Sequence, residues 1–193
     1  MEAARKIEMR YTYADYCTWD DGERWELIDG AAYAMAPAPS ELHQDALLEL
    51  AGQLRDFLKG KPCKVFIAPF DVRLNADTQD NTVVQPDILV VCDELKRKGG
   101  KGVVGAPDFI AEILSPSTSR HDRVTKFNLY QRSGVREYWI VDPDEKTVFV
   151  HILHDDKYFT HAYDDSDSIP VNVLEGCTID LTEVFSGLQR KAE

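Results

Sequence analysis

The chain has 193 residues, 44% of them hydrophobic, and a formal net charge of −12. This length suffices for one hydrophobic core and is short for two, so we expect residues 1–193 to form a single domain. No apolar run approaches the ~20 residues of a membrane helix. The segment from Met1 to Tyr13 is charged and lacks the apolar stretch of a signal peptide. We therefore expect a soluble, cytoplasmic protein that does not enter a membrane.

Four cysteines, Cys17, Cys63, Cys92 and Cys177, are widely spaced and form no C-x-x-C pair. This spacing argues against a zinc knuckle and against a disulfide framework. We expect all four to be reduced and most of them to be buried as small apolar residues.

The first predicted elements are a short helix over residues 11–18 and a hairpin. Asp29-Gly30 is a typical two-residue hairpin turn between strands at 24–28 and 31–35. Glu26 lies on the first strand. There it either lines an active-site cleft or is an ordinary exposed strand glutamate.

A long helix is predicted from its N-cap at Ser40 to about Leu58. Its apolar residues recur every three or four positions, so one face is expected to pack on a sheet. His43 lies in the first turn. It either takes part in the chemistry or only bonds a neighbouring carbonyl group.

The rest of the chain reads mainly as strands separated by turns. The predicted strands are at 65–68 with a continuation at 71–74, then at 83–92, 109–114, 136–142, 147–153 and 158–163. A turn at 115–118 leads into a helix at 119–133 that ends at Gly134, and a short helix is expected near 181–185. A glycine-rich loop at 94–105 either closes over a ligand or is unstructured. The pattern predicts an α/β (α+β) fold, with a central mixed β-sheet flanked by helices.

Asp87 and Glu112 are the strongest candidates for chemistry. Neighbouring strands lie ~4.8 Å apart, so two acids on adjacent strands can reach one ion. Mg²⁺ takes oxygen ligands and keeps several waters, so one or two carboxylates can hold it. Glu112 stands in an apolar strand, where a carboxylate needs a partner. Asp87 follows Pro86, and its alternative role is to bond backbone amides at the start of a strand.

Lys126 is the candidate cation beside these acids, because its helix follows the Glu112 strand and must fold back over the sheet. In phosphodiester hydrolysis a metal ion would orient and deprotonate a water, while the lysine would hold that water or neutralise developing charge. The alternative is a surface ion pair with Asp122, four residues earlier. Other chemistries lack their motifs: the chain has no Gly-x-Ser-x-Gly elbow, no P-loop and no H-x-x-x-H pair.

Basic residues are concentrated between Lys96 and Arg136, where nine of them accompany only three acidic residues. Affinity for nucleic acid comes largely from such side chains, so this region is predicted to attract a polyanion that the rest of the chain repels. The predicted nucleic-acid-binding residues are Lys96, Arg97, Lys98, Lys101, Arg120 and Arg123. A solvated helix face next to a lysine-rich loop accounts for the same charges.

Several motifs together resemble a known family. They are Pro86-Asp87, the run from Glu112 to Ser117, Lys126 to Tyr130, Ser133 to Pro143, Trp25 to Gly30, and His43-Gln44. This combination resembles the Uma2 family (DUF820) of restriction-endonuclease-like proteins, over about residues 12–185. The family is grouped with the PD-(D/E)xK nucleases, which have a mixed sheet flanked by helices and bind Mg²⁺.

The resemblance implies that Asp87 and Glu112 are the metal ligands, with Mn²⁺ as a substitute for Mg²⁺. Leu114 stands where the wider superfamily has its lysine, and in Uma2-like proteins the cation comes from the next helix, here Lys126. Two functions follow as expectations. One is a Mg²⁺-dependent endonuclease acting on DNA, with Glu26 and His43 in its cleft and, by analogy, a homodimeric assembly. The other is a nuclease-like fold without hydrolytic activity that binds protein or nucleic acid.

Overall fold

A six-stranded sheet forms the centre of the protein in the computed structural model, which describes residues 10–35, 39–115 and 119–187. In spatial order its strands are β11 (Lys157–Asp164), β10 (Thr147–His154), β9 (Glu137–Asp142), β8 (Phe109–Ile113), β6 (Ile88–Val91) and β3 (Lys64–Ile67). β8 and β9 run parallel, and the other neighbours are antiparallel. The predicted mixed sheet is confirmed.

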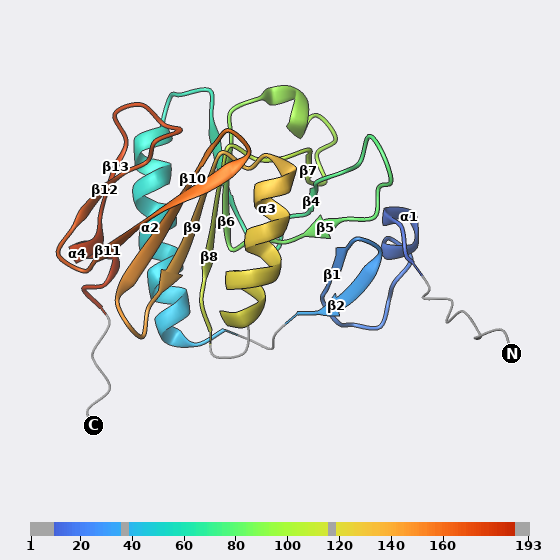
Figure 1. The fold of residues 1–193 in the computed structure, drawn as a ribbon, viewed down its shortest axis with the longest axis horizontal. Coiled ribbons are helices and arrows are strands. Elements are labelled where there is room, and N and C mark those ends of the chain that lie inside the picture. Colours follow the sequence, from blue (N-terminus) through green and yellow to red (C-terminus); the bar gives the residue numbers. More distant parts are fainter. Residues whose placement is uncertain (1–9, 36–38, 116–118, 188–193) are drawn as a thin grey trace, which may run out of the picture.

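Helices cover both faces of this sheet (Figure 1). α2 (Glu41–Leu58) packs on one face, and its N-cap Ser40 accepts a hydrogen bond from the amide of His43, as predicted. On the other face lie η2 (His121–Lys126), a π-helix, and α3 (Phe127–Ser133), which ends at the left-handed Gly134. None of the helices in the described ranges is long and apolar enough to cross a bilayer.

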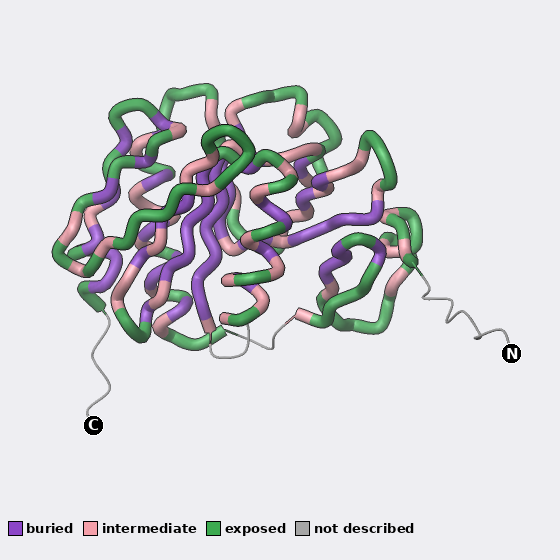
Figure 2. Tube along the Cα trace, in the orientation of Figure 1, coloured by how far each residue is buried: buried purple, intermediate pink, exposed green. Residues whose placement is uncertain are grey.

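The central strands β6, β8 and β9 are buried almost throughout (Figure 2), because both of their faces are covered. Along β8, Phe109, Ala111 and Ile113 pack in the cluster on the α2 side, whereas Ile110 packs in the cluster on the α3 side. Side chains alternate along a strand, so Glu112 projects from the α3 face.

A smaller sheet brings the N-terminal hairpin to the central one. Its order is β2 (Ala31–Ala34), β1 (Trp25–Ile28), β5 (Val83–Val84), β4 (Val72–Arg73) and β7 (Val103–Val104). The hairpin prediction is confirmed: Asp29 and Gly30 both have positive φ, at 52° and 81°, as a type I′ turn requires. Leu27 pairs with Val83, so the hairpin lies beside the segment that leads into β6.

Three smaller elements complete the described chain. α1 (Tyr13–Tyr16) is capped by Thr12, and α4 (Leu181–Val184) lies near the end, both as predicted. A two-stranded sheet of β12 (Ser168–Pro170) and β13 (Thr178–Asp180) was not predicted.

Two predicted elements are wrong in detail. The strand at 71–74 does not continue β3; its residues form β4 in the smaller sheet, where β4 pairs with β5 and β7. The segment at 94–105 is not a structureless loop, because it contains β7 and η1 (Glu94–Arg97), a 3₁₀ turn capped by the Asp93 carboxylate. The predicted turn at 115–118 lies largely outside the described residues.

The prediction that all four cysteines are reduced is wrong for two of them, since Cys63 and Cys92 form a disulfide. Lys64 pairs with Val91 in the antiparallel β3–β6 pair, and the next residues outward are these two cysteines. Their spacing in sequence did not reveal this register. Cys177 is a buried free thiol, as expected, whereas Cys17 is exposed.

Candidate active site

Asp87 directly precedes β6 and Glu112 lies on the neighbouring strand β8, close to the arrangement that the sequence predicted. Ile88 pairs with Ala111 in the antiparallel β6–β8 pair, so the same register sets Asp87 opposite Glu112. The Asp87 Oδ2 atom accepts a hydrogen bond of 2.8 Å from the amide of Ile113. The alternative role predicted for Asp87, bonding a backbone amide at a strand start, is therefore observed together with its proximity to Glu112.

The side chain of Lys126 points into the protein and contacts three carboxylates. Its Nζ atom lies 2.9 Å from Glu112 Oε1, 3.1 Å from Glu26 Oε1 and 3.7 Å from Asp122 Oδ1. Lys126 and Asp122 are both buried, so the alternative of a surface ion pair between them is wrong. One amine instead links acids from β1, β8 and η2.

Glu26 and His43, the two predicted cleft residues, lie beside these acids. Glu26 is 4% exposed, and its Oε1 atom accepts a hydrogen bond from the amide of Gln85 at 2.9 Å. The His43 Nε2 atom lies 3.2 Å from Asp87 Oδ2. Both residues belong to the same polar cluster, although each comes from a different helix or strand.

Burial and charge act in opposite directions on the acids of this cluster. Burial alone would raise the pKa of Glu26, but the charge of Lys126, the imidazole of His121 at 3.8 Å and a hydrogen bond from the amide of Gln85 bring that pKa down to about 2. Burial raises the pKa of Glu112 well above its ordinary value, even beside Lys126, because Asp122, Asp87 and Glu26 are also near. One lysine does not compensate several carboxylates, so the proton remains most readily on Glu112.

Lys126 itself stays charged. Burial favours its neutral form, but Glu112, Glu26 and Asp122 outweigh burial and raise its pKa well above the ordinary value. The cluster thus contains a fixed positive charge within a surplus of acidic groups.

Tyr130 is a member of this cluster that the sequence analysis did not identify. Its hydroxyl donates a hydrogen bond of 2.7 Å to Glu112 Oε1. It lies four residues after Lys126, a spacing that places two side chains on the same helix face and could have revealed it. The π-helical turn was also not predicted: the amide of Phe127 bonds the carbonyl of Asp122, five residues earlier.

The basic residues predicted to bind nucleic acid fall into two groups. Lys96 and Arg97 on η1, followed by Lys98 and Lys101, lie beyond the end of β6 opposite to Asp87 (Figure 1). Lys96 donates a hydrogen bond to the carbonyl of Ala106. The structure therefore does not bring these four to the acids, and their binding of nucleic acid stays a prediction.

Arg120 and Arg123 form the second group, on the helical segment that carries Lys126. Arg120 is exposed directly before η2. Arg123 donates from Nη2 to Asp142 Oδ2 at 2.8 Å. Both lie within two helical turns of Lys126.

The donor atoms of the cluster suit a hard divalent cation. Asp87 and Glu112 offer carboxylate oxygens from neighbouring strands, and Mg²⁺ needs only one or two carboxylates besides water. Within the described residues, no group of three or more His, Cys, Asp or Glu side chains is arranged to hold a metal ion. Two carboxylates would leave most of the coordination positions of such an ion to water.

The mixed sheet, with helices on both faces, has the restriction-endonuclease-like fold. The Uma2 family model, described as "Putative restriction endonuclease", matches residues 12–182, and the chain belongs to this family. It is 27% identical to the protein slr1290 of Synechocystis sp., described as uncharacterized, over 90% of each chain. A DUF820 protein of Anabaena variabilis, whose crystal structure is described as that of a "putative nuclease", superposes with a TM-score of 0.73 at 22% identity, over 91% of this chain and 98% of that one.

Proposed function

We propose that this protein is a metal-dependent endonuclease that hydrolyses DNA phosphodiester bonds, with Mg²⁺ held by Asp87 and Glu112. The observation that supports this most strongly is the contact of 2.9 Å between Lys126 Nζ and Glu112 Oε1. It joins a lysine to an acid that lies opposite Asp87 on the next strand. Mn²⁺ is expected to replace Mg²⁺, because it accepts the same oxygen ligands.

The bound ion would supply positive charge to the phosphodiester and lower the pKa of a water molecule. Lys126 would contribute a second positive charge, directed at the phosphate oxygens where negative charge develops. Glu26 holds the amine at 3.1 Å, which fixes its direction. Tyr130 holds Glu112 by donating to its Oε1 atom.

Asp87 is held by one oxygen only. Its Oδ2 atom is occupied by the amide of Ile113 and by His43 Nε2. Its Oδ1 atom makes no hydrogen bond or ion pair with the residues that the structure describes, so it is available as a ligand. His43 and the strand backbone thereby orient this acid toward the proposed ion.

The second candidate function is a binding module of the same fold without hydrolytic activity. Leu114 occupies the position of the superfamily lysine. Glu112 is only 3% exposed, so a phosphate can reach it only if the cluster opens. Both features favour binding over catalysis.

A plasmid-nicking assay with Mg²⁺, Mn²⁺ or EDTA tests the two candidates. We expect the wild type to nick DNA with either metal and not with EDTA, and we expect Glu112→Gln and Lys126→Ala to lose at least ~100-fold in rate. Glu175→Gln is the matched control, because Glu175 is exposed between β12 and β13. This variant should cleave DNA at the rate of the wild type. The folded fraction of each variant is measured by circular dichroism.

Equal cleavage by all four proteins would identify a contaminant and refute the proposal. Binding of DNA by the folded wild type without any cleavage would support the binding module instead.

A further inference from the structure

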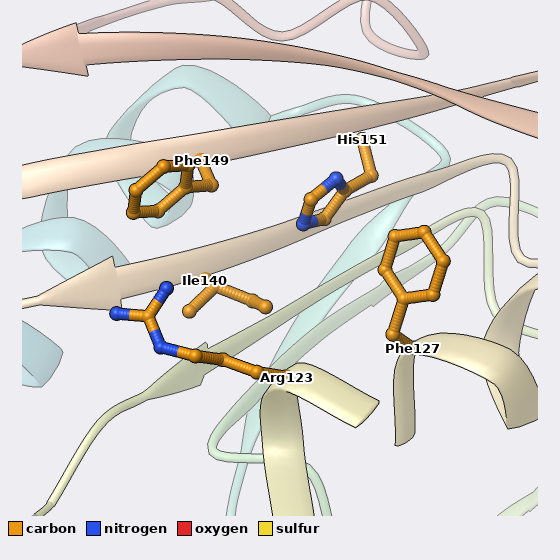
Figure 3. Close-up of a pocket in the computed structure, with 5 residues that line it drawn as sticks. All are labelled: Arg123, Phe127, Ile140, Phe149 and His151. Carbon is orange, nitrogen blue, oxygen red and sulfur yellow. The ribbon is translucent and has the colours of Figure 1, made fainter. Parts of the chain in front are cut away.

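A pocket of about 170 Å³ lies beside the candidate active site (Figure 3). Its lining comes from η2, α3, β9 and β10, and consists of Arg123, Phe127, Ile140, Phe149 and His151. Arg123 precedes Lys126 by three residues and Phe127 follows it directly. The helical segment that delivers the lysine to the acids therefore also forms one wall of this pocket.

The pocket and the acids share one face of the central sheet. Glu112 is aligned with Ile140 in the β8–β9 pair, and Ile140 lies opposite Phe149 in the β9–β10 pair. Neighbouring strands are ~4.8 Å apart, so two strand spacings separate Phe149 from Glu112 by ~10 Å across the sheet. Ile140 and Phe149 pack in the cluster on the α3 side, the side from which Glu112 projects.

His151 presents an unsatisfied polar atom at this pocket. The residue is 5% exposed, and its Nδ1 atom lies 2.8 Å from the hydroxyl of Thr160 on β11. Its Nε2 atom is buried and has no hydrogen-bond partner among the residues that the structure describes. In Figure 3 this second ring nitrogen points toward Ile140 and Arg123. Buried polar atoms without a partner are rare in proteins, so this one suggests a ligand.

His151 offers a hydrogen bond rather than a charge. Burial, together with the nearby positive charge of Arg123, lowers the pKa of His151 to about 4. The ring is therefore neutral at pH 7, and Nε2 can donate or accept one hydrogen bond according to the tautomer. A neutral ligand group with a hydrogen-bonding edge suits it better than an anion.

The other walls are aromatic and cationic. Phe127 and Phe149 stand on either side of His151 in Figure 3, and the Phe127 ring lies edge-on to the imidazole with centroids 4.9 Å apart. The guanidinium of Arg123 lies 5.1 Å from the Phe149 ring centroid. The Arg123 side chain is 36% exposed and forms an ion pair with Asp142 at 2.8 Å, so it forms the rim, and a ligand would reach Nε2 by displacing it from Phe149.

We propose that this pocket binds one unpaired nucleobase of the strand whose phosphodiester lies at the Asp87, Glu112 and Lys126 site. This inference rests on the proposed function. Aromatic rings stack on any base, the imidazole Nε2 atom would bond the polar edge of the base, and Arg123 would contact the attached phosphate. A nucleotide combines the flat ring, the polar edge and the adjacent negative charge that these walls suit, and its chain can continue toward the acids.

The size and position of the pocket limit what it accepts. Drug-sized ligands occupy sites of ~300–1,000 Å³, so about 170 Å³ admits a single ring system and excludes a base pair. Stacked nucleotides advance ~3.4 Å along a strand. A pocket ~10 Å from Glu112 therefore receives a base within about three nucleotides of the cleaved bond. The expected substrate preference is for single-stranded or unpaired DNA.

Binding without cleavage tests the pocket independently of catalysis. The full chain is titrated in EDTA at low salt against fluorescein-labelled oligothymidylate of about 10 nucleotides and against the matched duplex, with anisotropy as the readout. We expect the single strand to bind more tightly than the duplex. Phe149→Leu, which keeps an apolar side chain but loses the ring, should weaken single-strand binding about 5- to 100-fold. Phe159→Leu is the control, because Phe159 is an exposed aromatic residue on β11.

His151→Phe separates ligand binding from a structural role. It removes the unsatisfied nitrogen and also the contact with Thr160, whose exposed hydroxyl can bond water instead, so the melting temperature should change little while single-strand affinity falls. The ¹⁵N resonance of His151 Nε2, assigned by comparison with this variant, should also shift when thymidine 5′-monophosphate is added.

The outcomes distinguish this inference from the proposed function. Single-strand preference and a shifted Nε2 resonance in a protein that never cleaves DNA would support the pocket and refute the nuclease. A cleaving protein with unchanged affinity in Phe149→Leu and His151→Phe, or with no shift at Nε2, would refute the pocket alone.

Discussion

Lys126 on η2 and Glu26 on β1 are separated by a hundred residues, yet Lys126 Nζ lies 3.1 Å from Glu26 Oε1. The same amine lies 2.9 Å from Glu112 Oε1 on β8. β1 belongs to the five-stranded sheet and β8 to the six-stranded sheet. One buried lysine therefore connects the two sheets at the point where the candidate chemistry lies.

Replacing Lys126 by methionine should destabilise the fold, because it leaves buried carboxylates without their cation. Removing one partner from a buried ion pair costs ~3–5 kcal/mol, and urea denaturation measures this loss. The double variant Lys126→Met with Glu112→Gln should recover part of it, since a neutral amide then replaces the acid that Lys126 contacts most closely. Lys98→Met is the control, as Lys98 is exposed and should change stability little. An additive double variant would mean that the two residues do not interact.

Glu26 should make stability depend on pH in the acid range. Its pKa falls from the ordinary value of 4.5 to about 2 in the folded protein, so between these values the unfolded chain binds a proton that the folded chain does not. Its contribution is then complete above pH 4.5 and is lost as the pH falls toward 2. Thermal melts of wild type and Glu26→Gln, recorded from neutral pH down to about pH 2, should differ most near neutral pH and converge in acid. A difference in melting temperature between the two proteins that stays the same at every pH would contradict the lowered pKa of Glu26.

Metal binding should release a proton if Asp87 and Glu112 are the ligands. The raised pKa of Glu112 means that its carboxyl must be deprotonated before it can bind a cation. Affinity for Mg²⁺ is therefore expected to increase with pH. Calorimetric titrations in buffers of different ionisation enthalpy should report the released proton, and Glu112→Gln should abolish both the release and most of the affinity. The same heat in every buffer would show that no proton leaves.

Much of the fold could be predicted from local sequence signals. Asp29-Gly30 predicted the hairpin turn that both residues form with positive φ, and Ser40 predicted the start of α2. These features depend on a few neighbouring residues, so the chain reveals them directly. Strands β6 and β8 were likewise recognised from continuous apolar runs, which is typical of strands covered on both faces.

Features that depend on register were missed. The disulfide between Cys63 and Cys92 follows from the antiparallel pairing of β3 with β6, which no spacing in the sequence reveals. The position of η1 is a different case, because it follows from chain order: Asp87 directly precedes β6 and η1 follows it, so the predicted strand at 83–92 already set them at opposite ends. It separates the lysine-rich segment from the acids that it was expected to accompany.

The sequence by itself determined which residues could form a polar site: an acid within an apolar strand, another after a proline, and a lysine on the helix that follows. Only the tertiary structure decided that Lys126 turns inward to Glu26 and Glu112 instead of outward to solvent, and that Tyr130 joins them. The physical reason is that the π-helical turn and the pairing of β1 with β5 set the direction of these side chains. The pairing of β1 with β5 joins segments that lie far apart in the sequence, so no local stretch of the chain encodes it.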